Sequence, residues 1–569
     1  MSYQNAVTIA GAQATAFEML MDAVGRNQSP VIQQLLSSDP HLVHLKGWHG
    51  ITALHKACLI GDYNSVLMLI QANSDVNAAT DHLETPLHYA CKRGTPSIVH
   101  LLVQCGARLD LKDKLGRSAL HHAAEAGSVQ VVKYLEEVCE VNTGEQDLKL
   151  QSPLHIACTY GHYDLFHFLL KNRRCELLQE DIEGNLPIHL ACKHGFGHMT
   201  WTLLCLSGVS VLSRVNKGGY TPVDLVLQGD SYGHKELAGI LTGYREHPNK
   251  PVSGPVLLWY GWLMFPFTLY SVTTILCQQM ESYQFLIYLA AFLIAGIAMN
   301  GMTHRIKHIC RWPNPFYAGV FAAGITHTTF CYFWIIFPYI YTTWWVTLFS
   351  FIICPLLHLL FWTLLVKDPG SVTMSTHDIS TGKTLTLLDL CMIRNPPYNY
   401  CPSCDLVTNE VTKHCKLCNK CFLHLDHHCL FLLKCVAIRN HVHFVWLLIL
   451  SVLNMLAYLL GFFLYSHTRF DRQSWSDIAS QTLHQQAWPL SLVLLNSWSA
   501  VWCSFLLHTQ YTQVTKGCTT YFMHSVTQPL SLTRLQALTN FVHFLFNSPL
   551  PYKNPHSKLY SSHSTEVTI

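Results

Sequence analysis

The hexapeptide Thr85-Pro-Leu-His-Tyr-Ala90 decides the fold of the first half of the chain, because close copies of it recur at a nearly fixed interval. The six copies are Thr52-Ala-Leu-His-Lys-Ala57, Thr85-Pro-Leu-His-Tyr-Ala90, Ser118-Ala-Leu-His-His-Ala123, Ser152-Pro-Leu-His-Ile-Ala157, Leu186-Pro-Ile-His-Leu-Ala191 and Thr221-Pro-Val-Asp-Leu-Val226. Their first residues are 33, 33, 34, 34 and 35 positions apart. Such a period predicts a repeat protein in which each unit buries its apolar face against its neighbours.

These units resemble ankyrin repeats, which begin with Thr-Pro-Leu-His-x-Ala and have a period of about 33 residues. Each copy is followed by a Gly and a second apolar helix, as in Gly94 and then Ile98-Val99-His100-Leu101-Leu102. A degenerate extra unit is predicted over 17–45, where Val31-Ile32-x-x-Leu35-Leu36 has helical spacing. We therefore expect an ankyrin-repeat domain over 17–245.

The His that recurs in these repeats favours a structural role over a catalytic one. Equivalent catalytic His residues would create one active site per repeat, which no enzyme needs. In the ankyrin fold this His hydrogen-bonds within the turn. The array is therefore predicted to be a binding surface whose concave face takes a peptide or a partner domain.

Six long stretches in the second half of the chain contain no Asp, Glu, Lys or Arg. They are 256–276, 283–302, 316–341, 344–366, 443–466 and 488–507. About 20 helical residues cross a hydrocarbon layer about 30 Å thick. Buried helices of a soluble domain are the alternative, but six uncharged stretches of this length favour a multi-pass membrane protein.

The composition agrees with a soluble part joined to a membrane part. Charged residues make up 12% of the chain and hydrophobic residues 50%, whereas charged residues are about 25% of an ordinary soluble protein. These values argue against a disordered chain and against a purely soluble enzyme. The formal net charge of +3 argues against a nucleic-acid partner.

The distribution of Lys and Arg between the stretches predicts the orientation. Arg305, Lys307 and Arg311 follow the second stretch, and eight Lys or Arg lie from Lys367 to Arg439 after the fourth. The connections after the first and third stretches carry none. No signal-peptide pattern opens the sequence, so we expect both termini and the cysteine-rich segment to face the cytosol.

Seven of the 22 Cys lie between Cys401 and Cys435, which indicates metal and thiol chemistry in a reducing compartment. The segment reads Cys401-x2-Cys404-x9-His414-Cys415-x2-Cys418-x2-Cys421-x4-Asp426-His427-His428-Cys429-x5-Cys435. Without Cys429, six Cys together with His414 and His428 supply eight ligands, enough for two closed tetrahedral zinc sites. Adjacent residues of an extended chain point opposite ways, so His414 and Cys415 are expected to serve different ions.

The thiol of Cys429 is then the one that neither predicted zinc site uses. If 426–429 is extended, His427 and Cys429 share one face and His428 points to the other. A free thiol is only a few per cent thiolate at neutral pH, so a nucleophilic Cys needs a base beside it. We predict Cys429 as the nucleophile, His427 as its base and Asp426 as the carboxylate that orients the His. The alternative is that all seven Cys are structural.

The cysteine-rich segment resembles that of the DHHC protein S-acyltransferases, or palmitoyltransferases. With the ankyrin repeats and six spans, the whole chain resembles their ankyrin-repeat branch, the huntingtin-interacting type. The resemblance implies Cys429 as the acyl-accepting nucleophile. It implies one zinc on Cys401, Cys404, His414 and Cys421, and a second on Cys415, Cys418, His428 and Cys435. Two further family elements are matched by Asp368-Pro369-Gly370 and by Thr519-Thr520.

The chain departs from the family pattern in the residues around these groups. Thr408 to Val411 replace Lys-Pro-x-Arg, and Leu430 to Lys434 replace the Pro-Trp and Asn that usually follow the nucleophile. Phe522 stands where Thr-Thr-x-Glu has its Glu. No predicted metal ligand or triad residue is lost, so we expect an active enzyme with slow turnover or a narrow substrate range.

The predicted fold is therefore all-α, with an ankyrin solenoid, a six-helix membrane domain and a cytosolic cysteine-rich insert holding two zinc ions. The predicted domains are 17–245 for the repeats, 256–366 and 443–507 for the spans, 367–442 for the insert and 508–569 for a cytosolic tail. By resemblance, the protein lies in Golgi or ER membranes.

The predicted reaction is a two-step transfer of a fatty acyl group, palmitoyl by resemblance, from acyl-CoA through Cys429 to Cys residues of client proteins. Its predicted partners are acyl-CoA, clients bound by the repeats, and membrane lipid, which holds the acyl chain. Lys434 and Arg439 are candidates for contacts with the CoA phosphates.

Two other functions stay open. A weakly active or inactive chain would act as an ankyrin scaffold or trafficking adaptor in the membrane. A transporter or channel would be favoured by charge inside the spans, and there is none. The polar residues there, His327, His358, Asn454 and Asn496, are instead expected to hydrogen-bond between helices.

Overall fold

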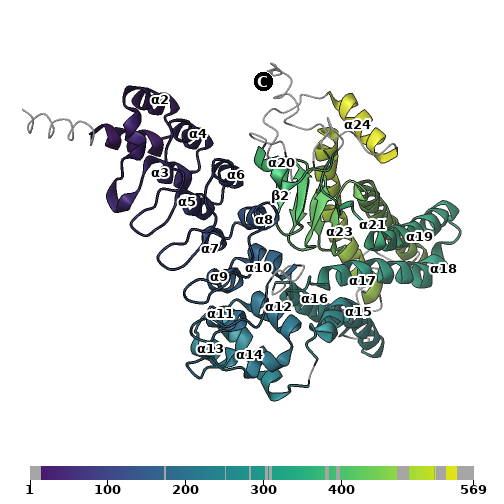
Figure 1. Cartoon of the computed structure of the whole chain (residues 1–569). Helices are drawn as coiled ribbons and strands as arrows, with labels where there is room; N and C mark the ends of the chain where they lie inside the picture. Colours follow the sequence, from purple (N-terminus) through teal and green to yellow (C-terminus); the bar gives the residue numbers. More distant parts are fainter. Residues whose placement is uncertain are drawn as a thin grey trace, which may run out of the picture. The chain divides into compact units, whose positions relative to one another are not determined.

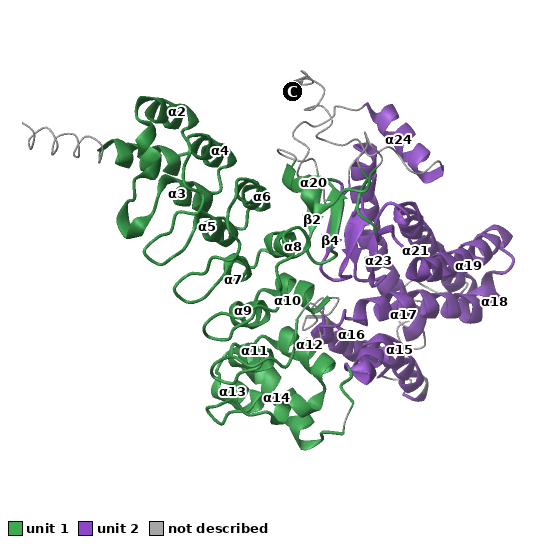
Figure 2. Cartoon of the chain, in the orientation of Figure 1, with its two compact units in different colours: residues 1–253, 374–410 green, residues 254–373, 411–569 purple. Residues whose placement is uncertain are grey.

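The computed structural model of the chain describes residues 15–171, 175–249, 251–280, 283–300, 305–306, 311–377, 383–392, 398–470, 486–517, 519–520 and 533–546. The chain divides into two compact units (Figure 2). The first unit holds residues 1–253 and 374–410, and the second holds 254–373 and 411–569. The division falls within the cysteine-rich segment, and each unit is described by itself.

Stacked helix pairs make up most of the first unit (Figure 1). A helix over 15–25 and α2 (Ser29–Ser38) form the degenerate opening pair. The six pairs that follow are α3 (Ala53–Ile60) and α4 (Tyr63–Gln71), α5 (Pro86–Arg93) and α6 (Pro96–Gln104), α7 (Ala119–Glu125) and α8 (Val129–Glu137), α9 (Pro153–Tyr160) and α10 (Tyr163–Leu170), α11 (Pro187–Lys193) and α12 (Gly197–Ser207), and α13 (Pro222–Gln228) and α14 (Tyr232–Glu246). The predicted ankyrin solenoid is confirmed.

The recurring His caps the first helix of its own repeat, and His55, His155 and His189 also bond to the next repeat. At the fourth repeat, the Ser152 backbone N–H and hydroxyl donate to His155 Nδ1 at 3.2 and 2.8 Å. The neutral ring therefore carries its proton on Nε2, which donates to the carbonyl of Asn185 at 3.3 Å. His155 is fully buried, and burial lowers its pKa, which keeps the ring neutral. This geometry supports the structural interpretation of the His.

Replacing His155 by Ala should lower the free energy of unfolding of the array by about 1–3 kcal/mol, because a buried N–H and a carbonyl lose their partner. Pulse proteolysis in denaturant on the detergent-solubilised chain measures the change. His44→Ala is the matched control, because His44 is exposed on the same array; its effect should stay within about 0.5 kcal/mol. Equal losses in the two variants would contradict the capping role.

Long apolar helices dominate the second unit. They are α15 (Val256–Gln279), α16 (Gln284–Asn300), α17 (Phe316–Cys331), α19 (Trp344–Val366), α21 (His441–Arg469) and α23 (Ala487–Thr515), with a π-helical turn at Tyr332–Ile336 and α18 (Phe337–Ile340) continuing α17. Within the described residues, five helices are long and apolar enough to cross a membrane, by length and composition. The predicted span over 283–302 forms a shorter apolar helix, Leu286–Ala298, and its last two residues lie outside the described part of the chain.

Polar side chains join these helices, as expected for a membrane bundle. Asn496 Nδ2 in α23 donates to Thr328 Oγ1 in α17 at 3.1 Å, and Asn454 in α21 accepts from the Cys354 thiol in α19 at 3.1 Å. His358 differs from the expectation, because its ring donates within its own helix to the carbonyl of Cys354 at 2.8 Å. Two of the four predicted interhelical polar residues therefore tie helices together directly.

Short antiparallel strands surround the cysteines and are the β structure of a mostly helical chain. In the first unit, β2 (Tyr398–Cys401) pairs with β3 (Leu406–Asn409). In the second unit, β5 (Lys420–Leu423) lies between β1 (Ser371–Val372) and β4 (Thr412–Cys415), and β6 (His427–Cys429) pairs with β7 (Lys434–Val436). Two further α-helices are α20 (Leu387–Met392) in the first unit and α24 (Arg534–Phe546) in the second.

Candidate functional site

Both Cys-x-x-Cys pairs lie in tight turns of the same construction. The Asp405 N–H donates to the carbonyl of Cys401, and the Asn419 N–H donates to the carbonyl of Cys415, each at 2.8 Å. Asp405 and Asn419 directly follow the second Cys of their pair, and both have left-handed backbone, with φ of 60° and 52°. Asp and Asn tolerate this conformation better than other non-glycine residues do. The sequence therefore forms two cysteine knuckles of matching shape.

The structure brings together the two ligand sets that the family resemblance implied. One is Cys401, Cys404, His414 and Cys421, and the other is Cys415, Cys418, His428 and Cys435. Within each set the ligand atoms lie within 4.8 Å of one another. Strand pairing explains why two of the four ligands in each set lie close together. His414 lies directly across from Cys421 on β4–β5, and His428 lies across from Cys435 on β6–β7.

The donor atoms of the second set fit a tetrahedral zinc ion. His428 Nδ1 lies 3.7, 3.3 and 3.7 Å from the Sγ atoms of Cys415, Cys418 and Cys435, and the Cys418 and Cys435 sulfurs are 3.5 Å apart. Ligands about 2.0–2.3 Å from a tetrahedral zinc are separated by about 3.3–3.8 Å. The two Cys/His groups could therefore bind zinc as closed sites with four protein ligands each.

Cys429 belongs to neither set. It is 6% exposed and packs in an apolar cluster with residues of α17, α19 and α21. The buried members of this cluster are Ile325, Leu357, Phe361, Leu364, Leu432, Val436, Phe444, Leu447 and Leu448. The extended β6 strand turns His428 toward the metal ligands and leaves His427 and Cys429 on the other face, as alternation along a strand requires.

His427 connects Cys429 to a buried carboxylate. Its Nδ1 lies 2.7 Å from Asp426 Oδ2, and its interaction with Cys429 favours the charged imidazole. Burial disfavours the charged imidazole, but the hydrogen bonds and negative charge of Asp426 and Cys429 outweigh it and raise the pKa of His427 to about 10. The ring of Phe444 lies edge-on to His427, with the centroids 5.2 Å apart. The arrangement can hold a proton on His427 beside the thiol.

Four donors surround the Asp426 carboxylate, which is 2% exposed. Besides His427, Gln510 Nε2 donates to Oδ2 at 3.0 Å, and the Thr520 N–H and hydroxyl donate to Oδ1 at 2.6 and 2.9 Å. Burial would raise the pKa of Asp426, but the His427 hydrogen bond, the charges of His441 and His427 and the Thr520 N–H hold it well below its usual range. Asp426 therefore stays ionised and fixes the orientation of His427.

Three residues of this network were not predicted from the sequence. Gln510 and Gln513 lie in the last turns of α23, and His441 begins α21. Gln510 Nε2 also donates to Gln513 Oε1 at 3.0 Å, and the His441 ring hydrogen-bonds Gln510 Oε1. All three are polar residues just outside the predicted spans 443–466 and 488–507, and that position was the one available clue to them.

Of the two family elements, Thr519-Thr520 contacts the site directly, whereas Asp368-Pro369-Gly370 contacts the segment after β7. Thr520 binds Asp426, and the Thr519 hydroxyl donates to the carbonyl of Leu425 at 3.0 Å. Asp368 Oδ2 accepts the Gly370 and Ser371 N–H groups at 3.2 and 3.1 Å, and a Cβ at Gly370 would lie 3.0 Å from the Ile438 side chain. Phe522 lies outside the described residues.

Both candidate CoA-binding cations already have partners. Lys434 Nζ donates to the carbonyl of Val366, the last residue of α19, at 2.9 Å. Arg439 donates to Asp368 Oδ2 at 3.3 Å, and both side chains of that pair are largely exposed. Lys434 therefore ties the β6–β7 hairpin to the end of a span helix, whereas Arg439 makes an exposed ion pair of the kind that contributes little.

Two models of known protein families match the chain. A family model described as DHHC palmitoyltransferase matches residues 394–525, and a model of three ankyrin repeats matches 20–113 and 91–181. The chain therefore carries a DHHC palmitoyltransferase domain together with ankyrin repeats, and the family predicted from the sequence is confirmed. With its apolar helices, this domain indicates a membrane protein.

Solved structures that match the chain include the ankyrin repeat domain of human ASB11. That domain is 25% identical, with the match covering 42% of this chain and 98% of the domain at a TM-score of 0.35. The comparison with curated proteins gave no match.

Substituting Cys418 by Ser should lower the zinc content of the purified protein by about one ion per chain, because a closed site loses one of its four ligands. Elemental analysis of the detergent-solubilised protein measures this. Cys429→Ser is the matched control, since Cys429 lies outside both ligand sets, and it should keep the zinc content of the wild type. Loss of an ion in the control would assign Cys429 to a metal and remove it as the free thiol.

Proposed function

We propose that the protein is an S-acyltransferase that moves a fatty acyl group, palmitoyl by family resemblance, from acyl-CoA to Cys residues of client proteins. One observation carries the proposal. Cys429 lies outside both ligand sets, beside the His427–Asp426 pair and against an apolar cluster of the span helices. A nucleophile, its base and its orienting carboxylate are the components of covalent acyl transfer.

In the first step, the Cys429 thiolate attacks the thioester carbonyl of acyl-CoA. The acyl–sulfur bond to CoA breaks, and the leaving CoA thiolate takes the proton held by His427. In the second step, His427 removes the proton of a client thiol, which attacks the Cys429 thioester and restores the Cys429 thiolate. Both steps exchange one thioester for another, so no ATP is consumed.

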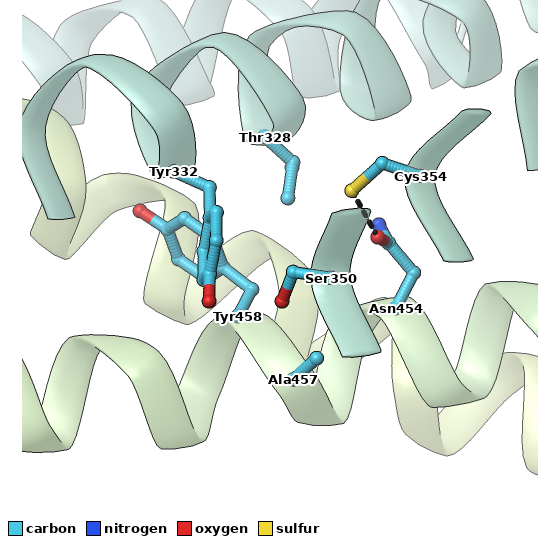
Figure 3. A pocket seen from close by; sticks show the side chains of 7 residues that line it. All are labelled: Thr328, Tyr332, Ser350, Cys354, Asn454, Ala457 and Tyr458. Atoms are coloured by element: carbon cyan, nitrogen blue, oxygen red, sulfur yellow. Dashed lines mark hydrogen bonds between the residues drawn. The ribbon is translucent and has the colours of Figure 1, made fainter. Parts of the chain in front are cut away.

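The apolar cluster around Cys429 supplies a place for the acyl chain. Ile325 and Leu357 lie one helical turn from Thr328 and Cys354, which line a small pocket deeper between α17, α19 and α21 (Figure 3). Polar side chains crowd this pocket, with Tyr332, Ser350, Asn454 and Tyr458 on its walls. An acyl chain directed away from Cys429 would gain about 0.8 kcal/mol for each CH2 that it buries and would end at this polar layer.

The chain's other charged and metal-binding groups have supporting roles in the proposal. The two zinc ions would hold the cysteine knuckles and hairpins in shape, since neither ligand set leaves a position open for substrate. Of the two cations, Arg439 is the better candidate for a CoA phosphate, because its exposed pair with Asp368 can exchange. The ankyrin repeats would recruit the clients, and the site would face the cytosol of a Golgi or ER membrane.

Substituting Cys429 by Ala should abolish hydroxylamine-sensitive labelling of the purified protein by palmitoyl-CoA, because no thiol remains to form the thioester. Cys503→Ala serves as the control, since Cys503 is buried in α23 outside the site, and it should label like the wild type. Unchanged labelling of Cys429→Ala would leave the chain as an ankyrin scaffold in the membrane.

Substituting Asp426 by Asn should slow acyl-enzyme formation about 10²–10⁴-fold, because an amide can neither stabilise the imidazolium nor fix its orientation. Single-turnover labelling at several pH values measures the rate, and zinc content shows that the fold persists. Glu410→Gln, a carboxylate of the same cysteine-rich segment, should leave the rate unchanged. Equal rates for Asp426→Asn and the wild type would remove Asp426 from the mechanism.

A further inference from the structure

Residues 374–410 of the cysteine-rich segment belong to the same compact unit as the ankyrin array (Figure 2). The short helix α20 packs against α6 and α8, the second helices of the second and third repeats. Leu387 and Cys391 of α20 are buried. The array therefore carries, on its row of second helices, a segment that follows it by more than 100 positions in the chain.

The tip of the first cysteine knuckle makes polar contacts with the same row of helices. Asp405, directly after Cys404, accepts from Lys133 Nζ of α8 and lies 3.5 Å from Lys171 Nζ, just past α10. The Ser403 hydroxyl donates to Asp164 Oδ1 of α10 at 2.8 Å. Two residues of one turn thus meet two neighbouring repeats.

The central ion pair of this contact is well shielded from water. The side chains of Lys133 and Asp405 are only 12% and 13% exposed. The Tyr400 hydroxyl donates to Asp405 Oδ1 at 2.7 Å, and Lys133 Nζ lies 5.3 Å from the centre of the Tyr400 ring. Removing one partner of such a pair leaves a poorly solvated charge, which costs more than the loss of a surface salt bridge.

We propose that the second helices of the third and fourth repeats form an intramolecular docking surface for the acidic cysteine knuckle at 401–405 of the same chain. The array thereby holds in place the segment that supplies Cys401 and Cys404 as candidate metal ligands, in addition to any role in recruiting clients. The surface is basic where the knuckle is acidic, and acidic at Asp164, where the knuckle offers a hydroxyl donor. This inference does not depend on acyl transfer.

A double-mutant cycle on the full chain in detergent tests the docking. Asp405→Asn removes the charge and keeps a residue that tolerates left-handed backbone, as Asn419 does in the second knuckle. Lys133→Met removes the opposite charge at similar length. Each single variant should speed hydrogen exchange of the 398–410 amides at least fivefold, and the double variant should be little faster than either one, because both substitutions remove one interaction.

Lys114→Met is the matched control, because Lys114 is exposed in a loop of the same array and should leave the exchange unchanged. On the unsubstituted chain, a carbodiimide should couple Lys133 or Lys171 to Asp405, which mass spectrometry of the digested protein detects. Absence of that cross-link, or exchange at 398–410 that is the same in Lys133→Met and the wild type, would overturn the proposal. The hydrogen-exchange and cross-linking measurements can both be repeated on Cys429→Ala. Failure of the docking is therefore distinguishable from failure of the acyl-transfer proposal.

Discussion

Alternation of side chains along the three-residue strand β6 is the constraint on which the site depends. His428 faces the ligand set that holds Cys435, its partner across β7, while His427 and Cys429 face the Asp426 network and the apolar cluster. A slip of one residue in this pairing would send His427 and Cys429 to the metal side. The register of one short hairpin thus separates Cys429 from the thiols that could bind metal.

The buried Asp426 carboxylate explains why distant segments meet at this hairpin. An ionised carboxylate removed from water needs several donors, and here they come from the adjacent His427, the end of α23 and the stretch that follows it. Thr519-Thr520 thus has a physical role, since its second hydroxyl and N–H bind Asp426 and its first anchors Leu425. This one charge therefore links the end of α23 and the stretch after it to the cysteine-rich hairpin.

Local patterns explain what the sequence could predict. A 33-residue period specifies stacked repeats, uncharged stretches specify apolar helices, and fixed Cys and His spacing brings ligands together on short turns. Contacts between residues far apart have no such pattern. Gln510 reaches Asp426 across 84 positions and Lys133 reaches Asp405 across 272, so neither could be inferred from spacing. The charge of Lys434 is visible in the sequence and makes this residue a candidate for CoA binding, whereas its bond to the Val366 carbonyl depends on where α19 ends.

The ankyrin array and the cysteine knuckle at 401–405 are both rigid, and this rigidity allows a few polar contacts to hold them together. His155 bonds its own helix cap and the next repeat, and His55 and His189 do the same through Glu84 and Arg214. This bonding links each of these three repeats to the next one. Ser403 and Asp405 are fixed in turn by the knuckle, whose left-handed residue is Asp405 itself. Two preformed surfaces lose little conformational entropy on meeting, so a single shielded ion pair and one hydroxyl contact can hold the knuckle against the array.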